Sequence, residues 1–450
     1  MRRRLPLALA FVLGLALPLG PAALAPVARA QPTESVPLPE LPADTPAADS
    51  ARLERVSLSV AIERALRRSP SLAVATADAR RAAALVEQVR AAALPTLTVN
   101  ATYTRLDDDR RLDTQVFVPA NQVAANAMLT VPLLAPARWA AWARSRDERQ
   151  LAELSAAEAR RQVVLTTAHA YLTVVTQHRA VEAAARARAL ALAHRERAQK
   201  RLGGGVGSQL DEVRALQALR EEEQRMERAA GLLWRAQGAL GALLGDGRPI
   251  DVSEEPALAE PLPVAEARAA ALRARPDLRM LALRLETSKR SVRDSFTDYL
   301  PVVTGVFMPM YQRPASLIQP ELSWQLQLQL TVPIYDGGLR YGLLHERQAR
   351  RDAAAASLSG ALAATDAELE AGVAELRHSS RSVELAREAA ALARRAVETA
   401  ALSFRLGATT SLDYLDAQRR ARDAEYAALV AEDELRRVRL DQLARAGQLP

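Results

Sequence analysis

The sequence contains no cysteine, and this absence rules out several kinds of site at once. Without cysteine there is no disulfide framework, no thiolate ligand for a metal, no cysteine nucleophile and no cysteine that a lipid could modify. Aromatic residues are also scarce, at 4% of the chain, whereas Ala, Arg, Leu and Glu are abundant. This composition favours long helices over a mixed α/β enzyme.

Patterns typical of catalysis or metal binding are missing as well. The five histidines show no ligand spacing, so we interpret all of them as helix-surface or packing residues: His169, His178, His194, His345 and His378. The glycine-rich stretch 203–207 lacks the Lys-Ser/Thr ending of a phosphate loop and is predicted to be a turn. No nucleophile–base pair is visible, and no Met- or His-rich tract indicates a dedicated metal exporter. We therefore expect no enzyme activity, no cofactor and no metal site.

The charge pattern and the N-terminus indicate a secreted chain without a nucleic-acid partner. The net charge is +7, but the arginines are interleaved with Glu and Asp, unlike a nucleic-acid-binding face. Residues 1–30 combine Arg2–Arg4, an uncharged Ala- and Leu-rich stretch and the A-x-A site Ala28–Ala30, as in a cleaved signal peptide. The alternative is a membrane anchor, which the prolines in this stretch disfavour. Residues 31–55 are predicted to form an extended linker.

One short stretch suggests a membrane-spanning strand. In Glu321–Pro333, ELSWQLQLQLTVP, Leu, Trp and Val alternate with Ser, Gln and Thr. A strand would place all apolar side chains on one face, and about eleven residues reach about 36 Å, enough to cross a bilayer at a tilt. The alternative is a half-buried strand of a soluble sheet. The other long uncharged run, 114–137, contains three prolines and suits strand and turn better than a spanning helix. No transmembrane helix is therefore predicted.

An internal repeat organises the rest of the chain. Residues 65–72, ALRRSPSL, match residues 271–278, ALRARPDL, and three further matches follow in the same order: 130–133 with 331–334, 201–203 with 405–407, and 210–211 with 412–413. We predict a first repeat over 56–261 and a second over 262–450. Each contains a short helix, a proline break, a helix, two strands, a very long helix, a turn and a returning helix.

The repeat sets the predicted element bounds. In the first repeat the helices are Leu58–Arg68, Ser71–Ala93, Arg138–Leu202 and Gln209–Leu244, with strands at about 96–106 and 121–133 and a tip turn at 203–208. In the second they are Val264–Ala274, Asp277–Tyr299, Leu339–Leu406 and Ser411–Ala446, with strands at about 302–312 and 321–333 and a tip turn at 407–410. Pro70 and Pro276 break the helices, and we expect Ser71 and Asp277 to cap the helices that follow. Pro309 is expected to weaken the end of its strand, and 107–118 and 313–320 are expected to be loops.

The two longest helices span about 100 Å each. Leu362, Leu369, Leu376 and Val383 recur every seven residues along the second of them, which is coiled-coil spacing. The helices 209–244 and 277–299 together nearly match this length. We therefore expect them to stack end to end beside one long helix, with 245–262 and the short helix at the junction.

Four strands cannot close a membrane barrel, because the smallest single-chain barrels have eight. An open edge in lipid would leave backbone groups unsatisfied, so the strands require an oligomer. Two chains would supply about eight strands and three about twelve, and only the larger barrel leaves room for a conduit.

Two motifs carry a resemblance to a known family. Residues 332–338, VPIYDGG, are similar to the strand-to-helix signature of the TolC family of outer-membrane efflux ducts, with Pro333, Asp336, Gly337 and Gly338 at the signature positions. Residues 404–407 and 411–418, FRLG and SLDYLDAQ, resemble the tip turn of that family. The resemblance covers about Val56 to Ala446.

The resemblance implies a mainly α-helical fold with membrane β-structure. It implies a homotrimer with a twelve-stranded barrel in the lipid of the Gram-negative outer membrane, a periplasmic α-barrel and an equatorial belt. Such a duct docks on a periplasmic adaptor and an inner-membrane pump of the RND, ABC or MFS class, and it passes efflux or type I secretion substrates passively. The alternatives are a periplasmic coiled-coil protein without a pore and a periplasmic adaptor, which would need lipoyl-like segments beside a single hairpin.

The resemblance also assigns site residues. Asp413 and Asp416 match carboxylates that constrict the tunnel entrance and bind cations, and Asp211 matches an aspartate that ties the closed tip. The remaining tip residues are expected at the adaptor contact: Gly203, Gly207, Gly407, Thr409, Thr410 and Ser411. Two positions depart from the family, because Phe404 replaces its tip tyrosine and Thr409 its tip arginine. For Asp211 and Asp413 the alternative role is helix N-capping. Three-fold symmetry would bring like carboxylates together and raise their pKa.

Overall fold

The computed structural model describes residues 53–112, 115–205, 207–315, 320–406 and 408–449. The expected signal peptide, most of the linker and Gly407 lie outside these residues. The first repeat contains α1 (Leu58–Arg68), α2 (Pro70–Ala91), β2 (Thr96–Arg105), β5 (Asn121–Leu134), α3 (Pro136–Gly203) and α4 (Gln209–Leu243). The second contains α5 (Val264–Ala274), α6 (Pro276–Arg293), β7 (Val302–Arg313), β8 (Leu322–Thr331), α7 (Leu339–Arg405) and α8 (Ser411–Arg445).

Three features differ from the expected elements. The helix predicted to run to Tyr299 ends at Arg293, and a 3-10 helix, η2 (Asp294–Tyr299), follows it. The expected loop 107–118 contains a ribbon of β3 (Arg110–Leu112) and β4 (Gln115–Val118). A parallel pair, β1 (Arg55–Val56) with β6 (Asp251–Val252), was not predicted, because two-residue strands leave no period to detect.

The helix starts after the proline breaks are capped differently from the prediction. Pro70 and Pro276 are the first residues of α2 and α6, where the missing N–H costs nothing. The cap of α2 is Ser69, whose Oγ accepts a hydrogen bond from the backbone N–H of Leu72 at 3.4 Å. Helix α6 has no side-chain cap, and Asp277 instead forms an ion pair with Arg275 at 2.7 Å. The roles expected for Ser71 and Asp277 were therefore wrong.

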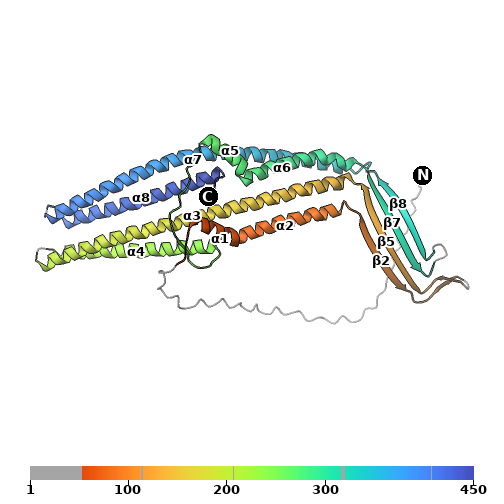
Figure 1. The fold of residues 1–450 in the computed structure, drawn as a ribbon, viewed down its shortest axis with the longest axis horizontal. Coiled ribbons are helices and arrows are strands. Elements are labelled where there is room, and N and C mark those ends of the chain that lie inside the picture. The colour runs from red at the N-terminus through yellow and green to blue at the C-terminus, as the bar shows by residue number, and fades with distance from the viewer. Residues whose placement is uncertain (1–52, 113–114, 206, 316–319, 407, 450) are drawn as a thin grey trace, which may run out of the picture. The chain divides into compact units, whose positions relative to one another are not determined.

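Each long helix is flanked by the shorter helices of its own repeat (Figure 1). Helices α4 and α2 pack along successive parts of α3, and α8 and α6 pack along successive parts of α7. The expected end-to-end pairing of α4 with α6 was therefore wrong. Along α7, Leu369 and Val383 are buried, in agreement with the seven-residue spacing.

The short helices explain this pairing. Helix α1 packs where α4 ends, in a core formed by Val56, Ala61, Ala65, Tyr171, Val174, Val175, Leu240, Leu244 and Ile250. Because α2 follows α1 directly, it continues along α3 from the point that α4 has reached. The second repeat repeats this arrangement, with Ala267 of α5 packed against Leu369 and Ala446 at the end of α8. These cores form the belt around the middle of the helices.

The four long strands form one antiparallel sheet in the order β2-β5-β7-β8. The register places apolar side chains on one face across all four strands: Leu97, Val99, Tyr103, Val123, Leu129, Val303, Phe307, Tyr311, Leu322, Trp324, Leu326, Leu328 and Leu330. On β8 this face is open, and Leu322, Leu326 and Leu328 are 69–72% exposed. The other face carries mainly Thr, Asn, Gln and Ser. The alternation predicted for residues 321–333 is thus present, over Leu322–Thr331.

The prolines of the sheet stand where the pairing is irregular. Pro309 lies inside β7, where it pairs with Trp324, and the strand continues to Arg313. On the side facing β5, the strand pairing is interrupted between the pair Asn126–Met310 and the pair Leu129–Phe307. Pro309 lies in this interval and has no N–H to donate to β5. Pro132 lies beside a register shift in β5.

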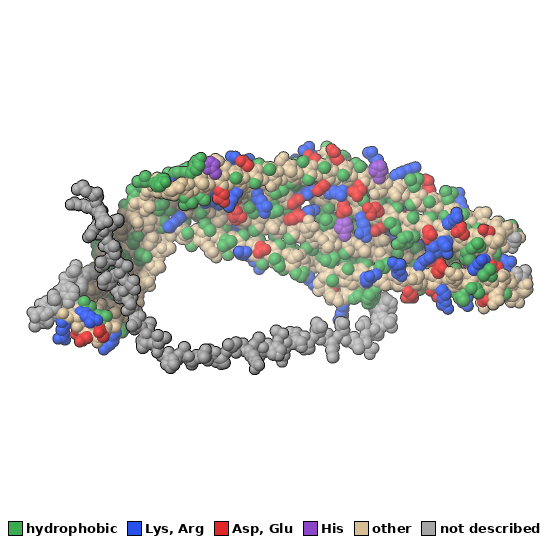
Figure 2. Space-filling model, turned by 180° about the vertical axis from the view of Figure 1, so that it is seen from behind, with side chains coloured by type: hydrophobic (Ala, Val, Ile, Leu, Met, Phe, Trp, Pro, Cys, Tyr) green, Lys and Arg blue, Asp and Glu red, His purple; other side chains and the backbone are tan. Residues whose placement is uncertain are grey.

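Acidic and basic side chains alternate over the helical part of the face in view in Figure 2. None of the helices that the structure describes has an apolar run long enough to span a membrane.

A close contact at Gly241 gives a test of the belt. A Cβ at Gly241 would stand 1.8 Å from the carbonyl oxygen of Arg248, whereas a Cβ at Gly238 of the same helix meets nothing within 4 Å. We expect Gly241→Ala to destabilise the protein by about 1–3 kcal/mol, because the backbone must move apart. Gly238→Ala should stabilise it by up to about 1 kcal/mol through helix propensity. Thermal unfolding followed by circular dichroism measures both, and equal melting temperatures would contradict the contact.

Candidate functional site

The two tip turns lie at the end of the helices remote from the sheet (Figure 1). The first turn closes when the N–H of Gly207 donates to the carbonyl oxygen of Arg201 at 2.9 Å. A Cβ at Gly207 would lie 2.7 Å from the backbone nitrogen of Leu202, so this position needs glycine. A Cβ at Gly203 would meet nothing within 4 Å. In the second turn the N–H of Ala408 donates to the carbonyl oxygen of Ser403 at 2.9 Å.

The second turn leads into α8 through a capping box. The backbone N–H and the hydroxyl of Thr410 donate to Asp413 Oδ2 at 3.1 and 2.7 Å, and the N–H of Asp413 donates to Thr410 Oγ1 at 3.3 Å. Asp413 therefore performs the capping role that was its alternative. The hydrogen bond from the Thr410 side chain, with that from its backbone, lowers the pKa of Asp413. The lowered pKa of Asp413 within one chain is opposite in direction to the raised pKa expected for a ring of carboxylates.

Asp211 connects the two tips. Its Oδ1 accepts a hydrogen bond from the hydroxyl of Ser411, which lies 200 residues away in the sequence and is buried. The cap of α4 is Ser208, whose Oγ accepts from the N–H of Leu210 at 3.1 Å, so the capping alternative does not apply to Asp211. The structure thus brings together two of the expected tip residues, one from each repeat.

An aromatic cluster lies next to this contact and was not predicted as part of the site. The ring of Tyr414 stacks on Phe404 at 5.9 Å and lies 5.0 Å from the ring of His194, between centroids. The guanidinium of Arg201 lies 4.9 Å from the centre of the Phe404 ring. His194 is 2% exposed. A lone histidine on a long helix gives no sequence signal for this position, since its burial depends on α7 and α8.

The environment of His194 disfavours the charged ring. Burial lowers its pKa, the nearby Arg197 lowers it further, and Asp211 opposes the shift. Neutral His194 is therefore part of the contact that joins α3 to the second hairpin.

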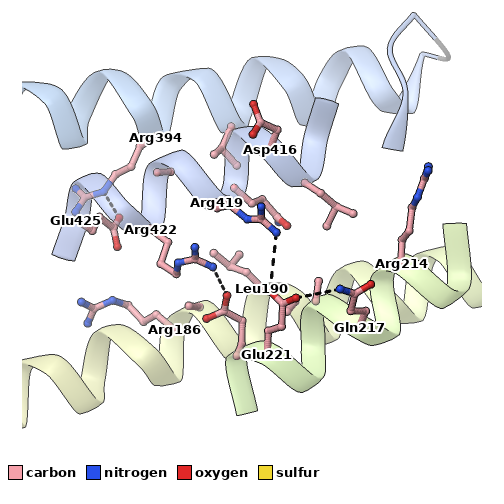
Figure 3. Close-up of a pocket in the computed structure, with 18 of the residues that line it drawn as sticks. Arg186, Leu190, Arg214, Gln217, Glu221, Arg394, Asp416, Arg419, Arg422 and Glu425 are labelled. Atoms are coloured by element: carbon pink, nitrogen blue, oxygen red, sulfur yellow. Dashed lines mark hydrogen bonds and ion pairs between the residues drawn. The ribbon is translucent and has the colours of Figure 1, made fainter. Parts of the chain in front are cut away.

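Asp416 takes no part in the capping box of Asp413. It lines a groove between the hairpins (Figure 3). The groove has a volume of about 510 Å³ and is lined by α3, α4, α7 and α8. Two ion pairs cross it, from Arg422 of α8 to Glu222 and from Arg419 to Glu221 of α4. A third pair, Arg394 of α7 with Glu425 of α8, lies within the second hairpin. Asp416 itself forms an exposed ion pair with Arg420 at 2.9 Å.

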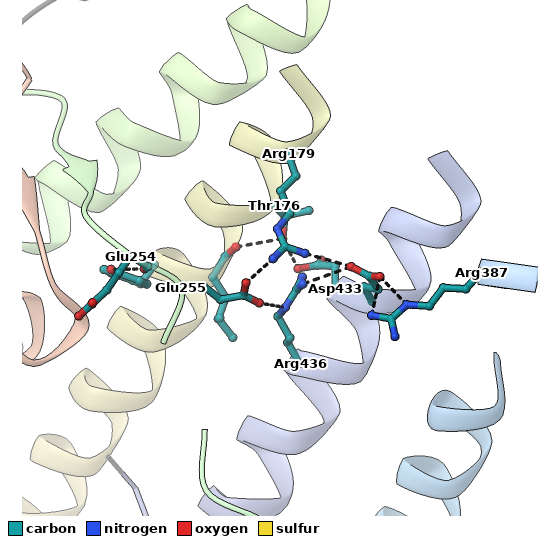
Figure 4. Close-up of polar contacts among 10 residues, drawn as sticks. Thr176, Arg179, Glu254, Glu255, Arg387, Asp433 and Arg436 are labelled. Atoms are coloured by element: carbon teal, nitrogen blue, oxygen red, sulfur yellow. Dashed lines mark hydrogen bonds and ion pairs between the residues drawn. The ribbon is translucent and has the colours of Figure 1, made fainter. Parts of the chain in front are cut away.

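A second polar network holds the hairpins together at the belt (Figure 4). Glu432 of α8 binds Arg179 of α3 at 3.0 Å and Arg387 of α7 at 2.8 Å. Glu255, in the segment after β6, binds Arg436 at 2.6 Å and also Arg179. Four parts of the chain therefore meet through two carboxylates.

The strand-to-helix signature forms the turn before α7. Asp336 accepts hydrogen bonds from the N–H groups of Gly338 and Arg340, both at 3.1 Å, and from Arg340 Nε at 2.6 Å. These bonds, the Arg340 side chain first, lower the pKa of Asp336. Gly337 and Gly338 have φ of +69° and +92°, which glycine tolerates. Arg340 also donates to the carbonyl oxygen of Pro333 at 2.9 Å, a role that sequence reasoning missed.

Within the described ranges, no group of three or more His, Asp or Glu side chains is arranged to hold a metal ion.

Comparison with known proteins defines the class. The sequence profile of the outer membrane efflux protein family matches residues 61–246 and 267–446, one segment in each repeat. The chain belongs to this family, and it is an outer-membrane exit duct for efflux. The family consists of transport channels. No curated protein sequence matches the chain.

Solved structures share the fold. The outer membrane protein VceC of Vibrio cholerae superposes with a TM-score of 0.72 at 20% identity, covering 87% of this chain and 96% of VceC. The CmeC outer membrane channel of Campylobacter jejuni has a TM-score of 0.73 at 16% identity, covering 87% and 86%. The open state of the MtrE outer membrane channel of Neisseria gonorrhoeae has a TM-score of 0.71 at 20% identity, covering 87% and 88%.

The pKa of His194 predicts a pH-dependent stability. Because the folded pKa lies below the ordinary value, the unfolded chain takes up the proton first as pH falls through about 6.5. Stability is therefore present above that pH and lost below it, by at most about 1.4 kcal/mol per pH unit. Between pH 7.5 and 5.5 the melting temperature of the wild type should fall more than that of His194→Phe. The control His378→Gln changes an exposed histidine and should follow the wild type; a wild-type curve parallel to His194→Phe would contradict the assignment.

Proposed function

We propose that three copies of the chain form the duct, with a twelve-stranded barrel in the outer membrane and an α-barrel in the periplasm. The observation that carries the proposal is the sheet: four strands with an open apolar face and with β2 and β8 at its two edges. Pairing β8 of one copy with β2 of the next would satisfy both edges in lipid. The apolar face would then contact lipid, and the face rich in Thr, Asn and Gln would line the conduit.

The periplasmic end is proposed to dock on an adaptor and, through it, on an inner-membrane pump of the RND, ABC or MFS class. Two features support this. The tip turns lie at the end of the hairpins remote from the sheet, where Gly203 and Thr410 are exposed, Gly207 and Thr409 are half-buried and Ser411 is buried. The groove between the hairpins is open and lined by charged side chains of both signs, as the rim of a protein interface commonly is.

Localisation and processing follow from the same proposal. Residues 1–30 are proposed to be removed on export and residues 31–55 to form the leading linker of the mature chain, ahead of the repeats 56–261 and 262–450. Because the sequence has no cysteine, the mature N-terminus has no thiol for lipid attachment.

Particle symmetry tests the trimer. Negative-stain images of protein extracted from outer membranes in mild detergent should show a three-fold particle about 130–140 Å long, made of about 100 Å of helix plus the barrel. The alternative, a coiled-coil protein without a pore, would be recovered from the soluble periplasm as a monomer or a two-chain rod.

The tip carboxylates are proposed to attract cations at the tunnel entrance, where three-fold symmetry would gather three copies of Asp413 and Asp416. In single-channel recordings, Asp413→Asn with Asp416→Asn should weaken block by a trivalent cation by about tenfold or more, because the entrance loses six charges per trimer while other groups remain. Asn at 413 can still accept the capping hydrogen bond, so the helix should persist. The control Glu384→Gln removes an exposed charge of α7 far from the tip along the helix. Equal block of the wild type and of the variant with Asp413→Asn and Asp416→Asn would contradict the proposed role.

A further inference from the structure

Methionines from two separate parts of the sequence meet on one face of the sheet. Apart from Met1 the chain has five methionines, and three of them lie in β5 and β7: Met128, Met308 and Met310. The pairs Asn126–Met310 and Leu129–Phe307 share one register, which places Met128 opposite Met308. Met310 stands two positions further along the same face of β7. Sequence spacing alone does not reveal this group, because about 180 residues separate its members.

The face that carries these methionines is the polar one. Met128 pairs with Thr98 of β2, and Met308 and Met310 pair with Gln325 and Ser323 of β8. Met128 is 37% exposed, and the other two are half-buried. Three thioethers thus stand together with hydroxyl and amide side chains on the neighbouring strands and Val306 beside Met308 on β7, with no carboxylate among their cross-strand partners.

The geometry brings the three sulfur atoms within reach of one ion. Cβ atoms of directly opposite residues lie about 4.5–5.5 Å apart, and those of diagonal neighbours about 7–8 Å apart. Methionine side chains have three rotatable bonds and adapt to such distances. Neutral thioethers are soft ligands that select Cu(I), while hard divalent cations prefer oxygen ligands. Ag(I) has the same charge, the same filled d shell and greater stability in air.

We propose that Met128, Met308 and Met310 form a thioether site for a soft monovalent cation, Cu(I) or Ag(I), on the polar face of the sheet. The site depends on the strand register and is independent of transport. If the barrel closes as proposed above, the trimer carries three such sites on the wall of its conduit.

Silver binding to the purified full-length protein in detergent tests the site. Equilibrium dialysis against Ag(I) in chloride-free, thiol-free buffer should give one ion per chain. Met308→Leu and Met128→Leu keep volume and apolarity but remove one sulfur each. Each should weaken Ag(I) binding by more than about tenfold, because loss of a residue that only supports a metal ligand already costs roughly that much. Met226→Leu and Met280→Leu change methionines of α4 and α6 and serve as matched controls.

A measurement on the wild type decides the question even if the sheet variants do not fold. With 13C-methyl-labelled methionine, the signals of Met226 and Met280 are assigned from the two helix variants. Addition of Ag(I) should shift three of the remaining signals and leave those two in place. No binding in dialysis, or binding and shifts unaffected by the loss of the sheet sulfurs, would overturn the proposal and leave the three methionines as packing residues. Particle symmetry and conductance are unaffected by either result, so failure of the site is distinct from failure of the duct.

Discussion

Backbone hydrogen bonding in lipid is the constraint on which the architecture depends. The sheet of β2, β5, β7 and β8 has an apolar face on all four strands, yet its outer strands lack a neighbour within the described part of the chain. Each unsatisfied N–H or C=O in hydrocarbon costs several kcal/mol, so edges that lie in lipid would require strands from other copies, as proposed above. The long helices continue from β5 and β8, and closure of the strands would therefore also bring the helices of neighbouring copies side by side.

Below the sheet, the two hairpins are held together with unequal strength. At the belt, a buried apolar core of Ala168 and Leu172 from α3 and Leu440 from α8 combines with the ion pairs of Glu255 and Glu432, which join four parts of the chain. Near the tips, the hairpins are joined by the Asp211–Ser411 hydrogen bond, the rings around His194 and the ion pairs of Arg422 with Glu222 and Arg419 with Glu221. Separation of the tips would break mainly polar contacts, whereas separation at the belt would also expose an apolar core. Local opening at the tips would therefore leave the core at the belt intact.

Much of the fold was predictable because its signals are local. The bounds of α1 and α5 followed from proline breaks, and β8 followed from its strict alternation. The strands β5 and β7 alternate poorly and were predicted only through the repeat. Pairing of helices was predicted wrongly, because it was inferred from helix lengths, and length alone does not decide which long helix a shorter one packs on. Of the site, the signature turn and the position of the tips were predictable, whereas the partners of Asp211 and Asp413 were not.

The sequence by itself determined the elements, the faces of the strands and the family resemblance, because side-chain periods, prolines and turn residues act over a few neighbouring positions. Only the tertiary structure decided which side chains meet. The burial of His194, the bond between Ser411 and Asp211 and the meeting of Met128 with Met308 each join residues about 180 or more positions apart. Such contacts depend on helix packing and strand register, which the whole chain sets through its cores and its belt rather than through any local pattern.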